Sequence, residues 1–305
     1  MGGGGMNNTR DQLKQYIIAS GQSQAVVAKE IRVSEAALSQ FLSETYNGNN
    51  EVLCRKVKAF IQKTEKNGLP PSAPGFIVTS IVKEIWYAVK YAHMNRDIAL
   101  IYGDAGRGKS KALREYAAKH AGVIYIEADA TTQNTKAILE EIWKAIGKRN
   151  PEPERYMKEG IIDELRDSGR LIIIDEANQL NHKALEAIRA LHDKGNMGIV
   201  LAGNSIIYER INSRNDTLYA QIVCRIGIRK HIFGKIAKSD IESLFEQKKL
   251  STRCTDYLHQ LANGKGGLTY MIKIYLLAEA AARSHKEELD VKHLSMAHKM
   301  QSGQY

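Results

Sequence analysis

The sequence predicts an α/β protein: a parallel sheet covered by helices, with a small all-helical unit before it and a helical unit after it. Between residues 77 and 234, short apolar runs alternate with helical patterns, and this alternation is typical of parallel strands joined by helices. A glycine-rich stretch, GDAGRGKS, directly follows one of the apolar runs. From residue 239 onward, one helical pattern follows another. These three observations predict the fold class.

Composition allows a sizeable core and sets broad limits on partners. The chain has 305 residues, of which 43% are hydrophobic, and this length is typical of two or three compact units. The net charge of +10 favours a polyanionic partner but leaves DNA, RNA and acidic proteins open. No apolar run is long enough to cross a bilayer, and the three cysteines show no C-x-x-C spacing. We therefore expect a soluble protein of a reducing cytoplasm, with no membrane partner.

The domain organisation follows from the prolines, which fall in two clusters that interrupt helical patterning. The first cluster, at 70–74, marks a linker, and the second, at 151–153, lies inside the α/β region. We expect an N-terminal helical domain at 1–66, a linker at 67–76, an α/β core at 77–234 and a C-terminal helical lid domain at 235–305. Residues 1–5, with four consecutive glycines before a second methionine, are interpreted as a cloning remnant.

The N-terminal domain contains a pattern that resembles a helix-turn-helix. In SQAVVAKEIRVSEAALSQFL the apolar residues have the spacing of two short crossing helices. The second helix, Ser34 to Ser43, would enter a DNA major groove, although Arg32 stands in the turn where the motif usually has glycine. A three-helix bundle for protein contacts remains an alternative. The candidate DNA-contacting residues are Ser34, which also suits a helix cap, Ser39 and Gln40.

The elements of the α/β core are predicted in chain order. A helix over Ile77–His93 comes first. Five strands are expected to follow, at Ile98–Tyr102, Val123–Ala128, Leu171–Ile174, Gly198–Ala202 and, with a weaker pattern, Gly227–Phe233.

The stretch GDAGRGKS has the spacing G-x-x-x-x-G-K-S, which wraps backbone N–H groups around a polyphosphate at a helix N-terminus. Glycines let the chain approach the phosphates closely. The lysine would meet the β- and γ-phosphates, and the serine hydroxyl would bind Mg²⁺. The sequence therefore predicts ATP and Mg²⁺ as cofactors. The predicted nucleotide-binding residues are Gly103, Gly106, Arg107, Gly108, Lys109, Ser110 and Lys111.

Polar residues end two further strands. LIIIDE is a buried strand followed by two carboxylates, a Walker B arrangement in which Asp175 would hold Mg²⁺ with Ser110 and Glu176 would polarise the attacking water. GIVLAGN ends at Asn204, which matches the sensor 1 position of AAA+ ATPases. There it would help to position the lytic water, or else only cap the next turn.

The order of these motifs resembles transposition protein B of Mu-like bacteriophages, with IstB and TnsC as related ATPases. The resemblance extends over nearly the whole chain and includes FLSETYNGNNE, VKEIWYAVKYA and DEANQLNHKALEAIRALHD. It implies an AAA+ P-loop NTPase with a helical lid, acting in the bacterial host cytoplasm. It further implies an ATPase that polymerises on double-stranded DNA without strict sequence preference, delivers that DNA to a transposase and is released on ATP hydrolysis.

The family resemblance also implies an arginine that reaches the γ-phosphate from a neighbouring subunit. Arg225, in QIVCRIG, is the first choice, with Arg229 and Arg214 as alternatives. In GGLTYMIK, Tyr270 occupies the position where the family usually has a sensor 2 arginine. Lys273, one turn later, is a candidate replacement.

Two loops of the core are candidates for gripping DNA phosphates. The first follows the second strand and the second contains the proline cluster; solvated loops without ligands are the alternative. The candidate residues are Thr132, Lys136, Lys148, Arg149, Arg155 and Lys158. Two other functions remain open, an AAA+ helicase loader or replication initiator and an ATP-switched transcription regulator.

Overall fold

The computed structural model describes residues 9–14, 16–17, 22–67, 73–212 and 219–303. The chain divides into two compact units. One comprises Val78–Asp240 with Leu261–Thr269, and the other comprises Met1–Ile77, Ile241–Gln260 and Tyr270–Tyr305. The predicted limits at 66, 76 and 234 remain a prediction of the sequence.

The first unit is built on a parallel five-stranded sheet with the order β2-β3-β4-β1-β5. Each strand lies within two residues of its predicted limits, and the α/β class is confirmed. The sheet places β4 between the strand of the glycine-rich loop, β1, and the strand of the two carboxylates, β3. The strands are β1 (Ile98–Gly103), β2 (Val123–Glu127), β3 (Leu171–Asp175), β4 (Gly198–Gly203) and β5 (Ile226–Ile232).

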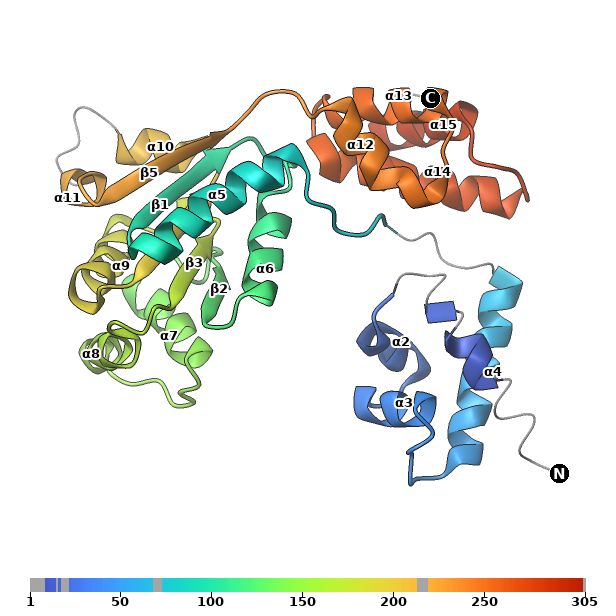
Figure 1. Cartoon of the computed structure of the whole chain (residues 1–305), viewed down its shortest axis with the longest axis horizontal. Coiled ribbons are helices and arrows are strands. Elements are labelled where there is room, and N and C mark those ends of the chain that lie inside the picture. The colour runs from blue at the N-terminus through green and yellow to red at the C-terminus, as the bar shows by residue number, and fades with distance from the viewer. Residues whose placement is uncertain (1–8, 15, 18–21, 68–72, 213–218, 304–305) are drawn as a thin grey trace. The chain divides into compact units, whose positions relative to one another are not determined.

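Helices cover both faces of this sheet (Figure 1). On one face lie α5 (Ser80–Asn95) and α6 (Lys109–Lys119). The other face carries α7 (Thr135–Ala145), α8 (Glu154–Leu165), η1 (Ala177–Gln179), α9 (His182–Gly195), α10 (Ser205–Ile211) and α11 (Ala220–Val223). The three central strands read as continuous apolar runs because side chains on both faces are buried.

Local sequence signals set the helix ends in this unit. The Thr79 hydroxyl accepts a hydrogen bond from the backbone N of Val82 and caps α5. Asn134 caps α7 and Asn181 caps α9 in the same way. At the start of α5, the Ser80 hydroxyl also donates to Asp240 over 2.6 Å, which fixes the end of the segment after β5.

The N-terminal segment folds as short helices around a core of its own. The helices are α2 (Gln24–Ile31), α3 (Glu35–Leu42) and α4 (Asn50–Asn67), and the core includes Val27, Leu38 and Phe41. Arg32 adopts the left-handed conformation, with φ 60°, in the turn between α2 and α3. The turn therefore takes the conformation that glycine usually supplies.

The C-terminal segment is helical, as the sequence predicts. Its elements are α12 (Lys238–Phe245), η3 (Glu246–Lys248), α13 (Thr252–Ala262), α14 (Gly267–Ser284) and α15 (Val291–Ser302). Phe245 and Tyr275 pack against each other in its interior, with ring centroids 4.7 Å apart and the ring planes tilted by 55°. Among the described residues, no helix has the length and apolar character needed to cross a membrane.

Candidate nucleotide-binding site

The predicted site residues of the core meet at one edge of the sheet. β1 ends at Gly103, β3 ends at Asp175 and β4 ends at Gly203. Because these strands are parallel and lie side by side in the order β3-β4-β1, their carboxyl ends share an edge. The glycine-rich loop, the two carboxylates and Asn204 therefore surround one position, where parallel α/β sheets commonly bind ligands.

The glycine-rich loop between β1 and α6 has a backbone that larger residues would not permit. Gly106 has φ +77°, and a Cβ there would lie 2.2 Å from the carbonyl oxygen of Gly266. Gly103 has φ +146°, and its Cβ would lie 2.1 Å from the carbonyl oxygen of Ile232. The loop is thus closely packed from outside, and its path depends on the absence of side chains.

Lys109 lies at the first position of α6 with its ammonium group folded into the loop. Its Nζ donates to the carbonyl oxygens of Gly103, over 2.8 Å, and Asp104, over 2.7 Å. The residue is only 8% exposed, and burial lowers the pKa of its amine. Neutral carbonyls are weaker partners for an ammonium than phosphate oxygens are. The loop therefore holds a cation that suits an anionic ligand.

Arg107 gives a second sign of an anionic ligand. Within the described part of the chain, its buried Nε and Nη1 atoms have no hydrogen-bond acceptor. Its Nη2 lies 3.8 Å from the Asp104 carboxylate, a distance too long for a hydrogen bond. Buried donors without acceptors are costly, so the residues present fit a nucleotide polyphosphate with its Mg²⁺. Ser110 and Asp175 supply the hard oxygen donors that Mg²⁺ prefers.

The carboxylates after β3 have different surroundings. Asp175 is 1% exposed, and its two oxygens accept hydrogen bonds from the Tyr125 hydroxyl, over 2.8 Å, and from the backbone N of Glu176, over 3.0 Å. Glu176 has φ 51° and ψ 35°, a left-handed conformation that is uncommon outside glycine. This conformation turns the chain sharply directly after β3. The Asp175 and Glu176 carboxylates are therefore carried by backbone of different conformation, although they are neighbours in sequence.

Asn204 follows β4 and caps the next helix. Its Oδ1 accepts from the backbone N of Ile206 over 3.0 Å, which is the capping role that the sequence left open. The cap uses only the carbonyl end of the amide, and Nδ2 keeps its donors. The backbone N of Asn204 donates to Asn178 Oδ1 over 3.1 Å. Asn178 was not predicted; only the fold places it beside a residue 26 positions away.

The loop also contacts the start of α14. The backbone N of Leu268 donates to the Gly106 carbonyl oxygen over 2.9 Å. Gly266 and Gly267 both have positive φ, and a Cβ on Gly267 would lie 2.7 Å from the same oxygen. The glycines of GKGGL therefore allow close backbone contact with the loop. The glycines are visible in the sequence, but only the fold shows which segment they contact.

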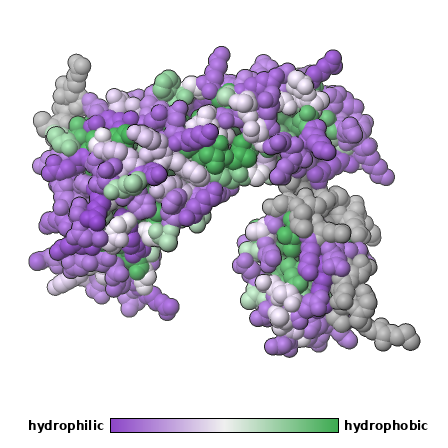
Figure 2. Space-filling view, viewed as in Figure 1, coloured by the Kyte–Doolittle hydropathy of each residue, from purple (hydrophilic) through white to green (hydrophobic). Residues whose placement is uncertain are grey.

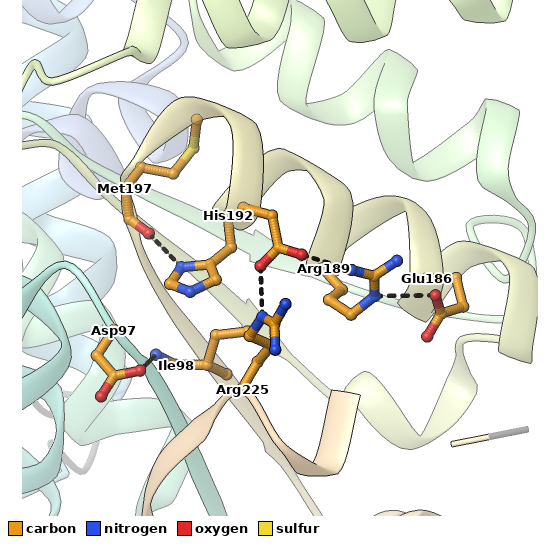
Figure 3. A network of polar contacts seen from close by, with 8 residues as sticks. Asp97, Ile98, Glu186, Arg189, His192, Met197 and Arg225 are labelled. Atoms are coloured by element: carbon orange, nitrogen blue, oxygen red, sulfur yellow. Dashed lines mark hydrogen bonds and ion pairs between the residues drawn. The ribbon is translucent and has the colours of Figure 1, made fainter. Parts of the chain in front are cut away.

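The three arginines that are candidates for reaching the γ-phosphate of a neighbouring subunit lie in different places. Arg225 directly precedes β5, at the edge of the sheet opposite the glycine-rich loop. Its Nε donates to Asp193 over 2.8 Å, and Asp193 also pairs with Arg189. Figure 3 shows Arg225 and Arg189 in this network of polar contacts. Arg229 donates to the carbonyl oxygens of Val223 and Ile226. Arg214 lies outside the described residues.

The candidate DNA residues of the core fall into two groups. Thr132 is 8% exposed, and its hydroxyl bonds to the backbone of Asp129, so it shapes the loop from inside. Lys136 is exposed and pairs with Glu140. Arg149 is exposed in the loop after α7.

The second group borders the outer surface of α8. Lys148 pairs with Glu164 and Arg155 pairs with Glu159. Lys158 borders two cavities of about 360 and 390 Å³. Arg166 and Lys194, which the sequence did not single out, share the first of these cavities with Arg155 and Lys158.

The remaining candidates lie in the helical segments. Ser34 Oγ accepts from the backbone N of Ala37 over 3.2 Å and caps α3, while Ser39 and Gln40 are exposed on that helix. Tyr270 packs edge-on against His298 with ring centroids 5.8 Å apart, and Lys273 is exposed on α14. Among the described residues, no group of three or more His, Cys, Asp or Glu side chains could hold a metal ion on its own.

Comparison with known proteins agrees with this geometry. Residues 92–211, which include the glycine-rich loop, both carboxylates and Asn204, match the AAA domain family. The chain contains an AAA domain. The match spans β1 through α10, so the elements that build the sheet edge belong to this AAA domain. The predicted AAA+ P-loop fold is thereby confirmed.

Two relatives align with the AAA domain and most of the rest of the chain. The Mu-like prophage FluMu DNA transposition protein B of Haemophilus influenzae is 28% identical over 279 residues, covering 90% of this chain and 97% of that protein. The ATP-dependent target DNA activator B of Escherichia phage Mu is 27% identical over 274 residues, covering 89% and 88%. The predicted resemblance to transposition protein B of Mu-like phages is confirmed.

Solved structures superpose on the chain more loosely. Domain III of the Thermotoga maritima replication initiation protein DnaA has 14% identity and a TM-score of 0.49, covering 73% of this chain and 92% of that chain. A Thermotoga maritima RuvB mutant has 13% identity and a TM-score of 0.48, covering 72% and 68%.

Proposed function

We propose that this chain is an ATPase that assembles on double-stranded DNA when ATP is bound, presents that DNA to a transposase and leaves it after hydrolysis. One observation carries the proposal: the glycine-rich loop, the paired carboxylates and Asn204 share one edge of the sheet. The names of the relatives, an ATP-dependent target DNA activator and a transposition protein, support the part that concerns DNA.

Each site residue has a role that its chemistry allows. Lys109 would exchange its two carbonyl partners for phosphate oxygens, and the loop N–H groups would hold the β-phosphate. Ser110 and Asp175 would hold Mg²⁺, which when bound neutralises charge on the phosphates. Glu176 would polarise the attacking water, and the Asn204 Nδ2 would orient it.

The proposal includes action between copies of the chain. Arg225 lies at the sheet edge opposite its own glycine-rich loop, so it serves the site of an adjacent copy more readily than its own. The Arg225 side chain is exposed, and ion pairs of exposed side chains contribute little to stability, so the guanidinium is able to change partner. The site would then be complete only in an assembly.

DNA contact is proposed for two surfaces, the basic group around α8 and the exposed face of α3. Around α8, Arg155, Lys158, Arg166 and Lys194 border one cavity. Glu159 and Asp163 also line it and pair with Arg155 and Arg166, so Lys158 and Lys194 carry its excess positive charge. On α3, the exposed side chains Ser39 and Gln40 are uncharged. Contacts to phosphates give sequence-tolerant binding. Figure 2 shows a largely hydrophilic surface, which suits a charged polymer better than an apolar partner.

Cosedimentation with random-sequence duplex DNA tests the function. The chain should sediment with DNA in ATP and much less in ADP, and a transposase should insert preferentially into DNA that the chain has bound. Binding restricted to one operator sequence would favour a transcription regulator. Copurification of a replicative helicase, without stimulation of strand transfer, would favour a loader.

A further inference from the structure

Asp175 is held by a side chain that none of the predicted motifs contains. Tyr125, in the middle of β2, pairs with Ile173 in the register of the sheet, and its hydroxyl reaches forward to Asp175 Oδ2 at 2.8 Å. Asp175 is 1% exposed, so solvent does not hold the carboxylate in place. The second oxygen accepts from the backbone N of Glu176. Together these two bonds fix the rotation of the carboxylate.

The direction of the hydrogen bond from Tyr125 is determined by a third residue. Arg114, on α6, donates from Nε to the Tyr125 hydroxyl oxygen over 3.2 Å, and its guanidinium lies over the tyrosine ring at 5.6 Å. An arginine only donates, so the tyrosine oxygen accepts there and its single proton is left for Asp175. Arg114 in turn donates from Nη2 to Glu127 over 2.6 Å.

This chain of contacts joins three elements that form the site. It runs from Glu127 at the end of β2, through Arg114 on the helix that begins with the glycine-rich loop, to Tyr125 and then to Asp175 at the end of β3. Outer partners of this kind orient the groups that hold a metal ion.

We propose that Tyr125 is a positioning residue that fixes the Asp175 carboxylate for the Mg²⁺ of a bound nucleotide, with Arg114 directing its hydroxyl. This role rests on the proposed ATPase function. It extends the site to β2 and to the middle of α6. It also assigns a function to the Tyr125 hydroxyl, the group that a phenylalanine at this position would lack.

The test is the Mg²⁺ dependence of nucleotide binding, measured by fluorescence with a labelled ATP analogue and without hydrolysis. For Tyr125→Phe, the Mg²⁺ concentration at half-saturation should rise about tenfold, because loss of an outer partner typically weakens a metal site by about 10- to 100-fold. Binding of the same analogue in EDTA should stay within about twofold of the unmodified chain, since the loop and Lys109 are untouched. Arg114→Gln should shift the Mg²⁺ midpoint in the same direction by a smaller factor.

Tyr116→Phe is the matched control. It removes a hydroxyl that contacts His93 over 3.1 Å, from the same helix as Arg114 but without a contact to Asp175, and it should leave the Mg²⁺ midpoint unchanged. An unshifted midpoint in Tyr125→Phe, with normal Mg²⁺ dependence in the unmodified chain, overturns the positioning role alone. If the unmodified chain binds no nucleotide, the proposed function and this role both fail. Should Tyr125→Phe lose its thermal transition, Arg114→Gln decides, since the Arg114 side chain is half exposed.

Discussion

Lys109 and Arg107 are cations placed in a loop in which three of the other six residues are glycine. Lys109 is buried and bonded to two carbonyl oxygens, whereas Arg107 has buried donors without acceptors in the described structure. Both arrangements are less favourable than contact with phosphate. The loop is therefore arranged for an anionic ligand, at a cost in its own stability.

Removing the ammonium group of Lys109 should weaken nucleotide binding directly. We expect Lys109→Ala to reduce ATP affinity about 10- to 100-fold, the effect of losing one or two hydrogen bonds to a charged group. Titration with a fluorescent ATP analogue measures this. Lys90→Ala, an exposed lysine on α5, is the control and should bind as the unmodified chain does. Unchanged ATP affinity in Lys109→Ala would show that the lysine does not bind the nucleotide.

Glu176 should matter for hydrolysis and not for binding. In Glu176→Gln the amide keeps the size of the side chain but cannot polarise water, so hydrolysis should fall about 100-fold or more while ATP binding remains. Single-turnover phosphate release, compared with binding of the same nucleotide, separates the two effects. Glu288→Gln, at an exposed position outside the site, is the control. Hydrolysis at the normal rate in Glu176→Gln would show that another group polarises the attacking water.

The sequence predicted those site residues that depend on local spacing. The loop from Gly103 to Ser110 and the pair Asp175 and Glu176 are contiguous, so a pattern of neighbours identifies them. The hydrogen bond of Tyr125 spans 50 residues and that of Asn178 spans 26. Such contacts depend on strand order and register, which no local pattern contains. The two uses of Asn204, as a cap and as a candidate sensor, were visible in advance because a cap is also local.

At the scale of elements, strand limits were predicted within two residues because the buried runs of a parallel sheet are bounded by polar or glycine residues. The turn between α2 and α3 was harder to predict, since Arg32 occupies a left-handed position without being glycine. Its conformation is supported by Lys56, whose Nζ donates to the Arg32 carbonyl oxygen over 3.3 Å. The turn is also closed by local backbone bonds, from the Arg32 N to the Lys29 carbonyl oxygen and from the Val33 N to the Ala28 carbonyl oxygen.

Ser34 distinguishes a structural from a DNA-binding role of α3. Ser34→Ala should destabilise α3 by about 1 kcal/mol through loss of the cap. Hydrogen exchange at the amides of Ala37 and Leu38 measures this. Ser34→Asp retains a cap but places a negative charge at the N-terminus of the helix. If α3 meets phosphates there, this variant should exchange normally and bind DNA more weakly. Normal DNA binding by Ser34→Asp would contradict contact at this end of α3.

At the scale of the whole molecule, the proposed completion of the site by another copy would make hydrolysis a property of pairs. Lys109→Ala removes the nucleotide site but keeps Arg225, and Arg225→Ala does the reverse. Each variant alone should hydrolyse little ATP, while an equal mixture should recover a substantial fraction of the activity. Steady-state ATPase assays of the mixtures measure this, with Arg229→Ala in place of Arg225→Ala as the comparison. A mixture no more active than its parts would exclude Arg225.

Assembly on DNA should depend strongly on salt. If several lysines and arginines around α8 neutralise phosphates, the logarithm of the affinity should fall linearly with the logarithm of salt concentration. Lys158→Ala combined with Lys194→Ala should weaken binding to all sequences alike and reduce the slope by about two, one for each lost phosphate contact. Fluorescence anisotropy with duplexes of several sequences measures both. An unchanged slope would show that the DNA-binding surface does not include this cavity.

The hydrogen bond from the Leu268 amide to the Gly106 carbonyl oxygen also affects which groups the start of α14 is able to bind. The first N–H groups of a helix commonly bind anions, but this one is already committed to the loop. With 18 residues, α14 is a rod of about 27 Å. A change in the direction of the first turn of a helix is enlarged along a length of this kind.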